Sequence, residues 1–432
     1  MKILLIGSGG REHALAWKIS QSKHCEKLYC APGNAGISNV ATCVDMADSD
    51  HQAILDFCHE KTIDFVVVGP EQPLVDGLGT MLRENNIAVF GPNKDAAQME
   101  GSKGFMKDFC ARHNIPTAEY QRFKSAEKAK EYVQEKGAPI VLKTDGLAAG
   151  KGVIIAQTVE EALTNIDEMM SGQAFGSAGT ELVIEEFMEG EEISYFALAD
   201  GETYLSLTSA QDHKRIGDGD TGLNTGGMGA YSPAHFMDAA LEEKILKRII
   251  EPTVEGMKKD GMPFQGILFA GLMIVKGEPR LIEYNIRFGD PECQPIMTRL
   301  ESDLVELLLA TDKGTLNEFK NNIKWSTNTA LCVVMASQGY PGSYEKGTVI
   351  QNTDALETLE DVQLFHAGTI TDNSGALINT GGRVLGVVGL GKTTLTAQSK
   401  AYEGVSLIAW PEGYFRKDIG YRAIDREKSK AA

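Results

Sequence analysis

The chain has 432 residues, too many for one compact core, so we expect two to four domains. A formal net charge of −18 disfavours binding to a long nucleic acid, because such binding relies on clustered Lys and Arg side chains. No apolar stretch approaches the roughly 20 residues that cross a bilayer, and the apolar run at the N-terminus is too short for a signal peptide. We therefore expect a cytoplasmic globular protein with no nucleic-acid or membrane partner.

The seven cysteines are scattered along the chain, and none forms a Cys-x-x-Cys pair. The odd count and the missing pattern disfavour both a disulfide framework and a structural zinc site. We expect reduced and mostly buried thiols.

The first hundred residues alternate between predicted strands and helices. Apolar runs over residues 2–6, 64–68 and 87–90 each end at glycine or proline, and a helical pattern runs from Pro73 to about Glu84. Such alternation is typical of a parallel, doubly wound α/β sheet. Ligands of these sheets bind beyond the carboxyl ends of the strands, where the glycine-rich turns lie.

The turn Gly7-Ser8-Gly9-Gly10 follows the first strand and looks like the start of a dinucleotide fingerprint. The spacing fails, because Gly-x-Gly-x-x-Gly needs glycine at position 12, where the chain has Glu12. A cradle for a mononucleotide or a sugar phosphate at the helix N-terminus stays open.

The middle of the chain predicts a small α+β unit. A strand over residues 139–143 ends at Lys143, a glycine-rich tip follows, and a second strand covers residues 153–156, which together predict a hairpin. From about Thr327 the pattern resets, with predicted strands over 330–336 and 383–388. We take this last part as a C-terminal domain.

A strand predicted over residues 280–286 carries the strongest functional signal. Side chains two apart on a strand share a face, so Glu283 and Asn285 point one way, while the other face carries Ile282, Tyr284 and Ile286. A carboxylate beside an amide oxygen suits a hard cation that takes further oxygens from phosphates. This pair predicts a site for Mg²⁺ or Mn²⁺.

Two charged side chains, Arg287 and Asp290, follow this strand directly. Their opposite charges are those needed to hold a small zwitterion by its carboxylate and its ammonium group. The alternative for the whole segment is a surface strand with ordinary charges.

Basic side chains also stand beside a glycine-rich loop. His213, Lys214 and Arg215 precede a stretch with six glycines between residues 217 and 229. Glycine allows backbone N–H groups to approach phosphate oxygens closely. We therefore expect this loop to bind a phosphate or an acyl phosphate.

Further charges are informative through their order along the chain. Lys103 and Lys143 come first, the acidic-aromatic segment Glu185-Glu186-Phe187 follows the glycine-rich tip, and Glu192 comes next. Taken singly, each is more often a solvated surface charge. The order of lysines, glycine loop, acidic-aromatic linker, carboxylate and metal pair resembles the ATP-grasp nucleotide site.

Residues 386–393 fit a different motif, the phosphate loop Gly-x-x-x-x-Gly-Lys-Thr, with Lys392 as its lysine. No apolar strand ending in Asp follows, and the remaining chain is too short for a phosphate-loop NTPase domain. We interpret the match as a coincidence.

As a set, the motifs resemble the phosphoribosylamine–glycine ligase family of the ATP-grasp superfamily. The resemblance runs along nearly the whole chain, and the Arg-Phe-Gly-Asp-Pro-Glu segment that starts at Arg287 is close to diagnostic. The matching segments are residues 7–15, 31–34, 69–74, 101–103, 143–152, 211–215, 224–229, 287–294 and 366–369.

The resemblance implies an α/β and α+β multidomain fold with four parts. These are an N-terminal doubly wound domain over residues 1–100, an ATP-grasp central domain over 101–122 and 190–326, an ATP-grasp lid lobe over 123–189, and a small C-terminal α/β domain over 327–432.

The family also implies a reaction of purine biosynthesis. ATP phosphorylates the carboxylate of glycine, and the amine of 5-phosphoribosylamine then attacks the glycyl phosphate. For ATP, the resemblance implies that Mg²⁺ or Mn²⁺ is held by Glu283 and Asn285, the phosphates by Lys103 and Lys143, adenine by Glu185, Glu186 and Phe187, and ribose by Glu192, with Gly150 and Lys151 in the loop that covers the nucleotide. The transferring phosphoryl group is expected to contact Arg215 and Asn224. Glycine is expected at Asp212, Arg287 and Asp290, and phosphoribosylamine at Gly9, Gly10 and Glu71.

We expect a monomer that binds glycine, phosphoribosylamine and ATP. Two alternatives stay open on the residues alone. The first is another ATP-grasp carboxylate–amine ligase with a different acid substrate. The second is a phosphate-loop NTPase that uses Lys392.

Overall fold

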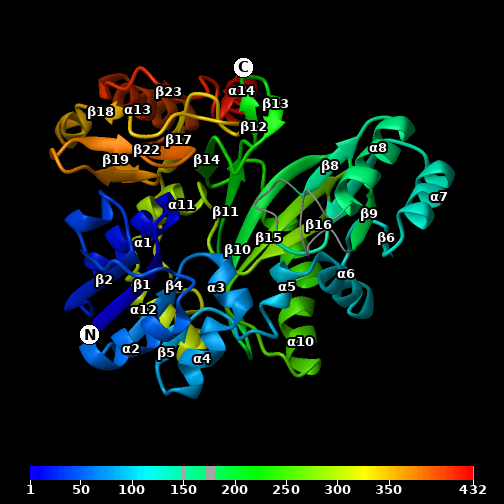
Figure 1. Ribbon diagram of the computed structural model, residues 1–432, viewed down its shortest axis with the longest axis horizontal. Coiled ribbons are helices and arrows are strands. Elements are labelled where there is room, and N and C mark those ends of the chain that lie inside the picture. The colour runs from blue at the N-terminus through cyan, green and yellow to red at the C-terminus, as the bar shows by residue number, and fades with distance from the viewer. Residues whose placement is uncertain (148–151, 172–180, 432) are drawn as a thin grey trace.

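The computed structural model describes residues 1–147, 152–171 and 181–431 (Figure 1). Within these ranges, no helix combines the length and the apolar character needed to cross a membrane. The chain forms a large body and a smaller lobe that projects from it, on the right of Figure 1.

The N-terminal part is a five-stranded parallel sheet of order β3-β2-β1-β4-β5, which confirms the doubly wound prediction. Every residue of β4 is buried, as expected for a strand of a sheet that is covered on both faces. Its elements are β1 (Lys2–Gly7), α1 (Gly10–Ser20), β2 (Lys27–Pro32), β3 (Thr42–Cys43), α2 (His51–Lys61), β4 (Phe65–Val68), α3 (Glu71–Asp76), α4 (Leu78–Glu84) and β5 (Ala88–Phe90).

The single helix expected from Pro73 to about Glu84 is wrong, because two short helices, α3 and α4, replace it. They meet at Gly77, whose φ of +106° lies in the left-handed region that favours glycine. The break turns α4 back toward β5, which it contacts.

The central part is an antiparallel sheet that continues without interruption into the C-terminal part. The strand order is β16-β15-β10-β11-β14-β17-β22-β19, so the boundary expected near residue 327 falls between two paired strands, β14 and β17. The strands are β10 (Glu191–Asp200), β11 (Tyr204–Asp212), β14 (Gly229–Ser232), β15 (Gln265–Val275), β16 (Glu278–Asn285), β17 (Thr329–Ser337), β19 (Val362–His366) and β22 (Arg383–Gly391).

Helices and small strands surround this sheet. The helices are α5 (Gln98–Gly101), α6 (Lys103–Arg112), α9 (Ala239–Ile245), α10 (Glu251–Lys259), α11 (Cys293–Arg299), α12 (Leu304–Lys313), α13 (Thr394–Leu407) and α14 (Tyr421–Ala431). The small strands are β12 (Arg215–Gly217), β13 (Thr221–Asn224), β18 (Val349–Ile350), β20 (Thr369–Thr371), β21 (Leu377–Asn379) and β23 (Gly413–Tyr414).

The projecting lobe has its own four-stranded sheet, of order β6-β9-β7-β8, and its own buried core. The predicted hairpin is confirmed, since β7 and β8 pair antiparallel from Lys143 back to Ile140. A separate core allows this lobe to move as a unit relative to the central sheet. Its elements are β6 (Tyr120–Phe123), α7 (Ala126–Lys136), β7 (Ile140–Thr144), β8 (Val153–Ala156), α8 (Val159–Met170) and β9 (Leu182–Glu186).

Two buried histidines join the N-terminal and C-terminal parts. The backbone N–H of His366 donates to Nδ1 of His13 over 2.7 Å, and the two rings lie 5.6 Å apart. Burial lowers the pKa of His13 to about 3 and that of His366 to about 4. Both imidazoles are therefore neutral in the folded protein near pH 7.

This contact predicts acid-dependent stability. As pH falls below about 6.5, the two histidines take up protons in the unfolded chain, whereas in the folded protein they stay neutral until the pH nears their lowered pKa values. Protonation therefore favours the unfolded chain, and folding stability is lost as pH falls toward 4. Replacing His13 by Asn keeps an acceptor and removes the titration. Urea unfolding at pH 7 and pH 4 should show that His13→Asn loses roughly 3 kcal/mol less than the wild type. Equal losses in the two proteins would contradict this origin.

Candidate functional site

Strand β16 presents Glu283 and Asn285 together on one face, as the sequence predicted. Both pair in register with β15, Glu283 opposite Gly271 and Asn285 opposite Phe269. The prediction that Ile282 shares the buried face of the strand with Tyr284 and Ile286 is wrong, because the pairing register with β15 shifts at Ile282. Leu281 enters the core in its place, and Ile282 is only half-buried.

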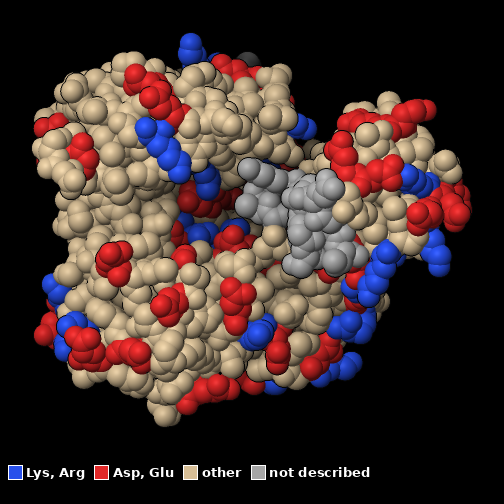
Figure 2. Space-filling view, in the orientation of Figure 1, with Lys and Arg blue, Asp and Glu red and all other residues tan. Residues whose placement is uncertain are grey.

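Lysines gather around Glu283. Burial alone would raise the pKa of this carboxyl, but Lys214, Lys143 and Lys103 outweigh that effect and hold it below its usual range. Figure 2 shows acidic and basic side chains together in the hollow of this face. An ionised carboxylate and an amide oxygen beside three ammonium groups form a donor set that fits a hard divalent cation and polyphosphate oxygens.

Lys103 is positioned by the start of α6. Ser102 caps this helix by accepting from Phe105 N–H, and its hydroxyl donates to Asp145, which follows the hairpin strand β7. Lys103 Nζ donates to the Gly146 carbonyl over 2.9 Å, and burial lowers its pKa. Two predicted parts of the nucleotide site, the helix lysine and the glycine-rich tip, thus lie side by side. Gly150 and Lys151 lie outside the described residues.

Glu185 lies buried between two lysines. Its carboxylate is 3.0 Å from Lys143 Nζ and 2.8 Å from Lys107 Nζ, and all three side chains are almost fully buried. Lys107 was not among the predicted site residues, although it stands one helical turn after Lys103 on α6. Glu185 therefore neutralises and orients Lys143.

The rest of the acidic-aromatic segment lies at the junction between the lobe and the central sheet. Glu186 pairs with Arg280 and accepts from Glu119 N–H, while the side chain of Phe187 is 39% exposed. Farther along, Glu192 forms an ion pair with Lys214. This pair joins the predicted ribose carboxylate to the lysine that faces Glu283.

Asp212 and Glu292 form a pair of neighbouring acids, of which Glu292 is buried and Asp212 is half-buried. Oδ1 of Asp212 is buried and has no hydrogen-bond partner in the described part of the chain. Burial, followed by the charge of Glu292, raises the pKa of Asp212 well above its usual value. Glu292 accepts from Ser194 Oγ over 3.1 Å, and burial raises its pKa as well. An orphan acid beside a second acid is suited to receive a small ammonium group.

Arg287 is held by two acids that come from the N-terminal part of the chain. Its Nε lies 3.1 Å from Glu71 and its Nη2 lies 3.1 Å from Glu100. Burial opposes ionisation of Glu71, but Arg287 and Arg11 lower its pKa to about 2. Burial raises the pKa of Glu100 to about 7. Glu71 therefore orients Arg287, and its expected contact with phosphoribosylamine stays a prediction.

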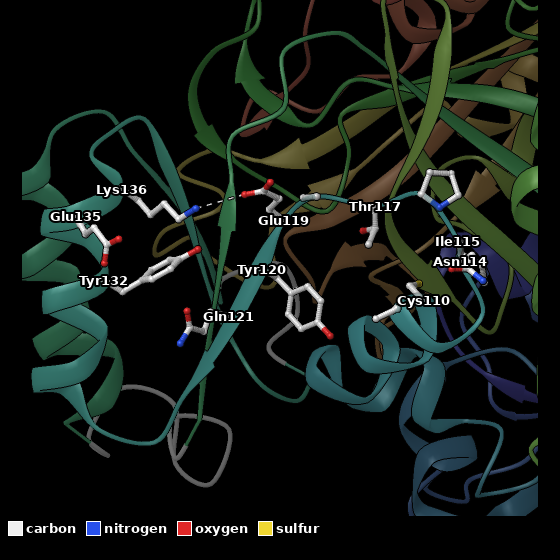
Figure 3. A pocket seen from close by; sticks show the side chains of 13 residues that line it. Cys110, Asn114, Ile115, Thr117, Glu119, Tyr120, Gln121, Tyr132, Glu135 and Lys136 are labelled. Atoms are coloured by element: carbon white, nitrogen blue, oxygen red, sulfur yellow. Dashed lines mark hydrogen bonds and ion pairs between the residues drawn. The ribbon is translucent and has the colours of Figure 1, made fainter.

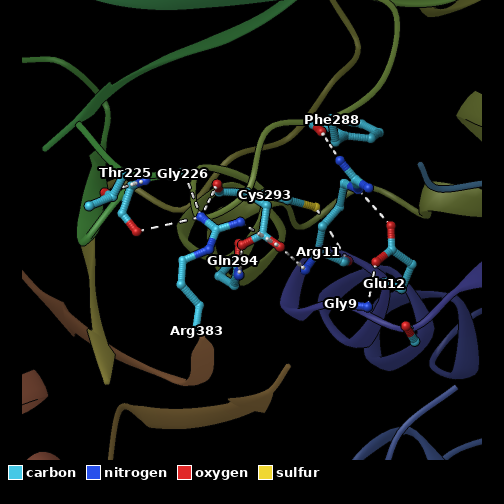
Figure 4. Close-up of polar contacts among 12 residues, drawn as sticks. Gly9, Arg11, Glu12, Thr225, Gly226, Phe288, Cys293, Gln294 and Arg383 are labelled. Carbon is cyan, nitrogen blue, oxygen red and sulfur yellow. Dashed lines mark hydrogen bonds and ion pairs between the residues drawn. The ribbon is translucent and has the colours of Figure 1, made fainter. Parts of the chain in front are cut away.

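A second hollow, of about 280 Å³, lies where the N-terminal and C-terminal parts meet. Asp290 lines it, so its position favours the ligand of this hollow over glycine. Figure 4 shows Arg383 and Gly9 on either side of Gln294. The lining is Ser8, Gly9, Gly33, Asn34, Asp290, Tyr340, Ala367, Gly368, Thr369, Ile370, Thr380 and Arg383.

The glycines of the Gly9-Gly10 turn are needed for close approach. A Cβ on Gly10 would lie 2.5 Å from Gln294 Nε2, and one on Gly9 would lie 2.7 Å from Glu12 Oε2. Glu12 accepts from Gly9 N–H over 2.7 Å and fixes the turn at the start of α1. This is the carboxyl end of β1, beside β4, where doubly wound sheets bind ligands.

Arg215 and Asn224 lie opposite each other on a small two-stranded hairpin, β12–β13. Asn224 is exposed, and Arg215 Nη1 donates to the Gly222 carbonyl over 2.8 Å. Their expected contact with a transferring phosphoryl group stays a prediction.

The larger hollow, of about 790 Å³, lies elsewhere, between α6, the 113–119 linker and α7 of the lobe (Figure 3). Tyr120 and Tyr132 line it, and Lys136 pairs with Glu119 across it over 3.4 Å. None of the predicted site residues lines it, so size does not identify the substrate site.

The phosphate-loop alternative fails on geometry. Gly386 and Gly389 belong to β22, where their backbones pair with β17 and β19 on either side. A phosphate loop needs free N–H groups between strand and helix. Here α13 begins directly after the strand, and Lys392 is exposed.

We therefore expect Lys392→Ala to leave ATP turnover within about twofold of the wild type, since surface substitutions of this kind change little. Steady-state ATP consumption checks this. Abolished turnover with an unchanged melting temperature would restore the alternative.

A separate lobe, with lysines and a carboxylate–amide pair between it and the central sheet, defines the ATP-grasp class of ATP-dependent ligases. Family models for phosphoribosylglycinamide synthetase match the chain in three segments: the N domain at residues 1–100, the ATP-grasp (A) domain at 101–293 and the C domain at 330–422. The chain belongs to this phosphoribosylglycinamide synthetase family.

Individual relatives agree. The chain is 58% identical to the phosphoribosylamine–glycine ligase of Agrobacterium fabrum and 52% identical to that of Escherichia coli O157:H7, over 99% of this chain and 100% of each relative. A crystal structure of phosphoribosylamine–glycine ligase from Thermotoga maritima superposes with a TM-score of 0.85 at 33% identity, covering 97% of this chain and 100% of that one. A biotin carboxylase domain of Hydrogenobacter thermophilus shares the fold at 15% identity, with a TM-score of 0.73.

Proposed function

We propose that the chain joins glycine to 5-phosphoribosylamine at the expense of ATP. The carboxylate of glycine attacks the γ-phosphorus of ATP, which gives glycyl phosphate and ADP. The amine of phosphoribosylamine then attacks the acyl carbon, which forms the amide, releases inorganic phosphate and frees one proton. The observation that carries this proposal is the face of β16: Glu283 and Asn285 stand among Lys103, Lys143 and Lys214, next to the orphan acid Asp212.

For the first step, a bound Mg²⁺ or Mn²⁺ would be held by Glu283 and Asn285 and would neutralise charge on the ATP phosphates. Lys103 and Lys143 bind those phosphates. Phosphoryl transfer needs positioning and charge neutralisation more than covalent help, which suits an array of fixed cations. Glu185, Glu186 and Phe187 contact adenine, Glu192 contacts ribose, and Gly150 and Lys151 belong to the covering loop.

Glycine lies with its ammonium at Asp212 and Glu292 and its carboxylate toward Arg287 and the γ-phosphate. Glu292 is buried, Asp212 is half-buried, and Oδ1 of Asp212 has no hydrogen-bond donor in the described chain. An ammonium group supplies such a donor and leaves the carboxylate of glycine free to react. Arg215 and Asn224 stabilise the transferring phosphoryl group.

Phosphoribosylamine occupies the smaller hollow beyond β1. The Gly9-Gly10 turn lies at the positive end of α1, which suits a phosphate, and Asp290 suits the ribose hydroxyls or the amine. The amine can then reach the acyl phosphate from the N-terminal side.

We also propose the domain division given above, a cytoplasmic location that fits the family, and a monomer.

The experiment that tests this function measures ATP consumption with glycine, phosphoribosylamine and the divalent cation, each omitted in turn. Phosphoribosylamine can be formed in place from ribose 5-phosphate and ammonia. Full turnover is expected only with all three present. Turnover without glycine at the rate of the full reaction would contradict the proposal and would favour a related ligase with another acid substrate.

A further inference from the structure

One turn of the glycine-rich loop is held by side chains of the C-terminal part. Arg383, the first residue of β22, donates through Nη1 to the Gly226 carbonyl and, over 3.5 Å, to the Gly227 carbonyl. The N–H of Gly226 donates to the Tyr340 hydroxyl over 3.0 Å. Both peptide groups of this glycine are thus fixed from outside the ATP-grasp part. A Cβ on Gly226 would lie 3.0 Å from the guanidinium carbon, so the turn and Arg383 are in close contact.

The same turn covers the proposed glycine subsite. Thr225 N–H donates to the Lys214 carbonyl over 2.8 Å, and Met228 N–H donates to the His213 carbonyl over 2.9 Å, so the turn lies directly on the segment that follows Asp212. A Cβ on Gly227 would lie 2.7 Å from Oδ1 of Asp212, the orphan oxygen. A displacement of this turn therefore changes the space around the bound ammonium group.

Arg383 and Tyr340 also line the smaller hollow. Arg383 Nη1 donates to the Asp290 carbonyl over 2.5 Å, and its Nη2 lies 3.6 Å from Oδ2 of Asp290. The neighbouring carboxylates of Asp290 and Asp212 keep its pKa raised despite burial, so it stays charged. Figure 4 shows this guanidinium between Gly226 on one side and the Gln294 and Arg11 region on the other. One cation thus contacts both the smaller hollow and the turn that covers Asp212.

We propose that Arg383 and Tyr340 are positioning residues that couple the phosphoribosylamine pocket to the glycine subsite through the Gly226–Gly227 turn. This inference rests on the proposed function. A ligand in the smaller hollow fixes the guanidinium and the phenol, and these fix the turn over Asp212. The acyl phosphate is then held and shielded only when the amine that consumes it is in place. Without this coupling, glycyl phosphate is lost to water, which returns glycine and inorganic phosphate.

The test compares the stoichiometry and substrate dependence of two variants with those of the wild type. Tyr340→Phe removes the hydroxyl that accepts from Gly226 N–H, and Arg383→Gln removes the positive charge and the guanidinium group. We expect ADP and the amide product to form in a 1:1 ratio in the wild type, and ADP to exceed amide severalfold in Arg383→Gln. The KM for phosphoribosylamine should rise about tenfold in Arg383→Gln, the effect of losing one charged hydrogen bond, and less in Tyr340→Phe. Arg383→Lys should recover part of both effects.

Lys400→Gln is the matched control, since it removes a C-terminal cation that pairs with Asp361 on the far side of this part. It should keep the 1:1 ratio. The inference is overturned if Arg383→Gln keeps both the 1:1 ratio and the wild-type KM for phosphoribosylamine, whatever happens to its melting temperature or kcat. If the wild type itself makes no amide from glycine and phosphoribosylamine, the proposed function has failed instead.

Discussion

Replacing Glu283 by Gln is expected to reduce amide formation by about 10²–10³-fold, the effect of removing one preorganised charge from a phosphoryl-transfer site. The substitution keeps the size of the side chain but removes a carboxylate whose charge interacts with Lys214, Lys143 and Lys103 together. The divalent cation loses its ionised ligand, and the three lysines lose the negative charge that they share. Steady-state rates over a range of Mg²⁺ concentrations measure both the loss and the shift in metal dependence.

A variant of the same strand provides the control. Glu278 lies at the exposed end of β16, where it pairs with Lys244 and Arg248. Glu278→Gln should retain nearly full activity, because exposed ion pairs contribute little. A Glu283→Gln protein with wild-type rates at every Mg²⁺ concentration would remove Glu283 from the metal site.

The candidate site on β16 could be predicted from the sequence, because the patterns that indicate it are local. A period of two places Glu283 and Asn285 on one face whatever the partner strand is, and the lysines stand at a helix start and at a strand end. The bulge at Ile282 was not readable, because a bulge arises from the register with β15 rather than from the residues of β16 alone. The break at Gly77 did have a signal, namely a glycine in the middle of a helical pattern.

Residues that complete the site from distant parts of the chain carry no such signal. Glu100, Lys107 and Arg383 look like ordinary surface charges in the sequence, and only the packing of three parts buries them against the site. Glu292 is an intermediate case, since it lies inside the Arg287–Gln294 segment but has no distinctive spacing. A charged side chain that is buried differs from one at the surface, because a charge removed from water is costly unless it is paired with an opposite charge or a ligand.

This principle also explains why the ligand-free protein retains unfavourable groups. Arg287 compensates Glu71, and Glu185 compensates Lys143 and Lys107, so these charges are satisfied within the protein. Asp212 is different, because burial and Glu292 both oppose its ionisation. A group that destabilises the protein and faces a substrate subsite is expected to be kept for binding.

We therefore expect Asp212→Asn to raise the KM for glycine by about 10–100-fold, the effect of losing a hydrogen bond to a charged group, while the KM for ATP stays nearly constant. The same variant should keep or raise the melting temperature of the ligand-free protein, since it removes an acid whose ionisation is opposed by burial and by Glu292. Steady-state kinetics and thermal unfolding measure these two effects on the same preparation. Opposite signs for binding and stability are the signature of a functional acid.

Asp200 serves as the comparison, because it is a buried acid on the neighbouring strand end that accepts from the N–H groups of Glu202, Thr203 and Leu316. Asp200→Asn should lower the melting temperature and leave the KM for glycine unchanged, since its charge serves backbone donors. Glu292→Gln should act in the same direction as Asp212→Asn, and the double variant should show less than the sum, because both acids bind one ammonium group. A lower melting temperature with an unchanged glycine KM in Asp212→Asn would make Asp212 a structural acid like Asp200.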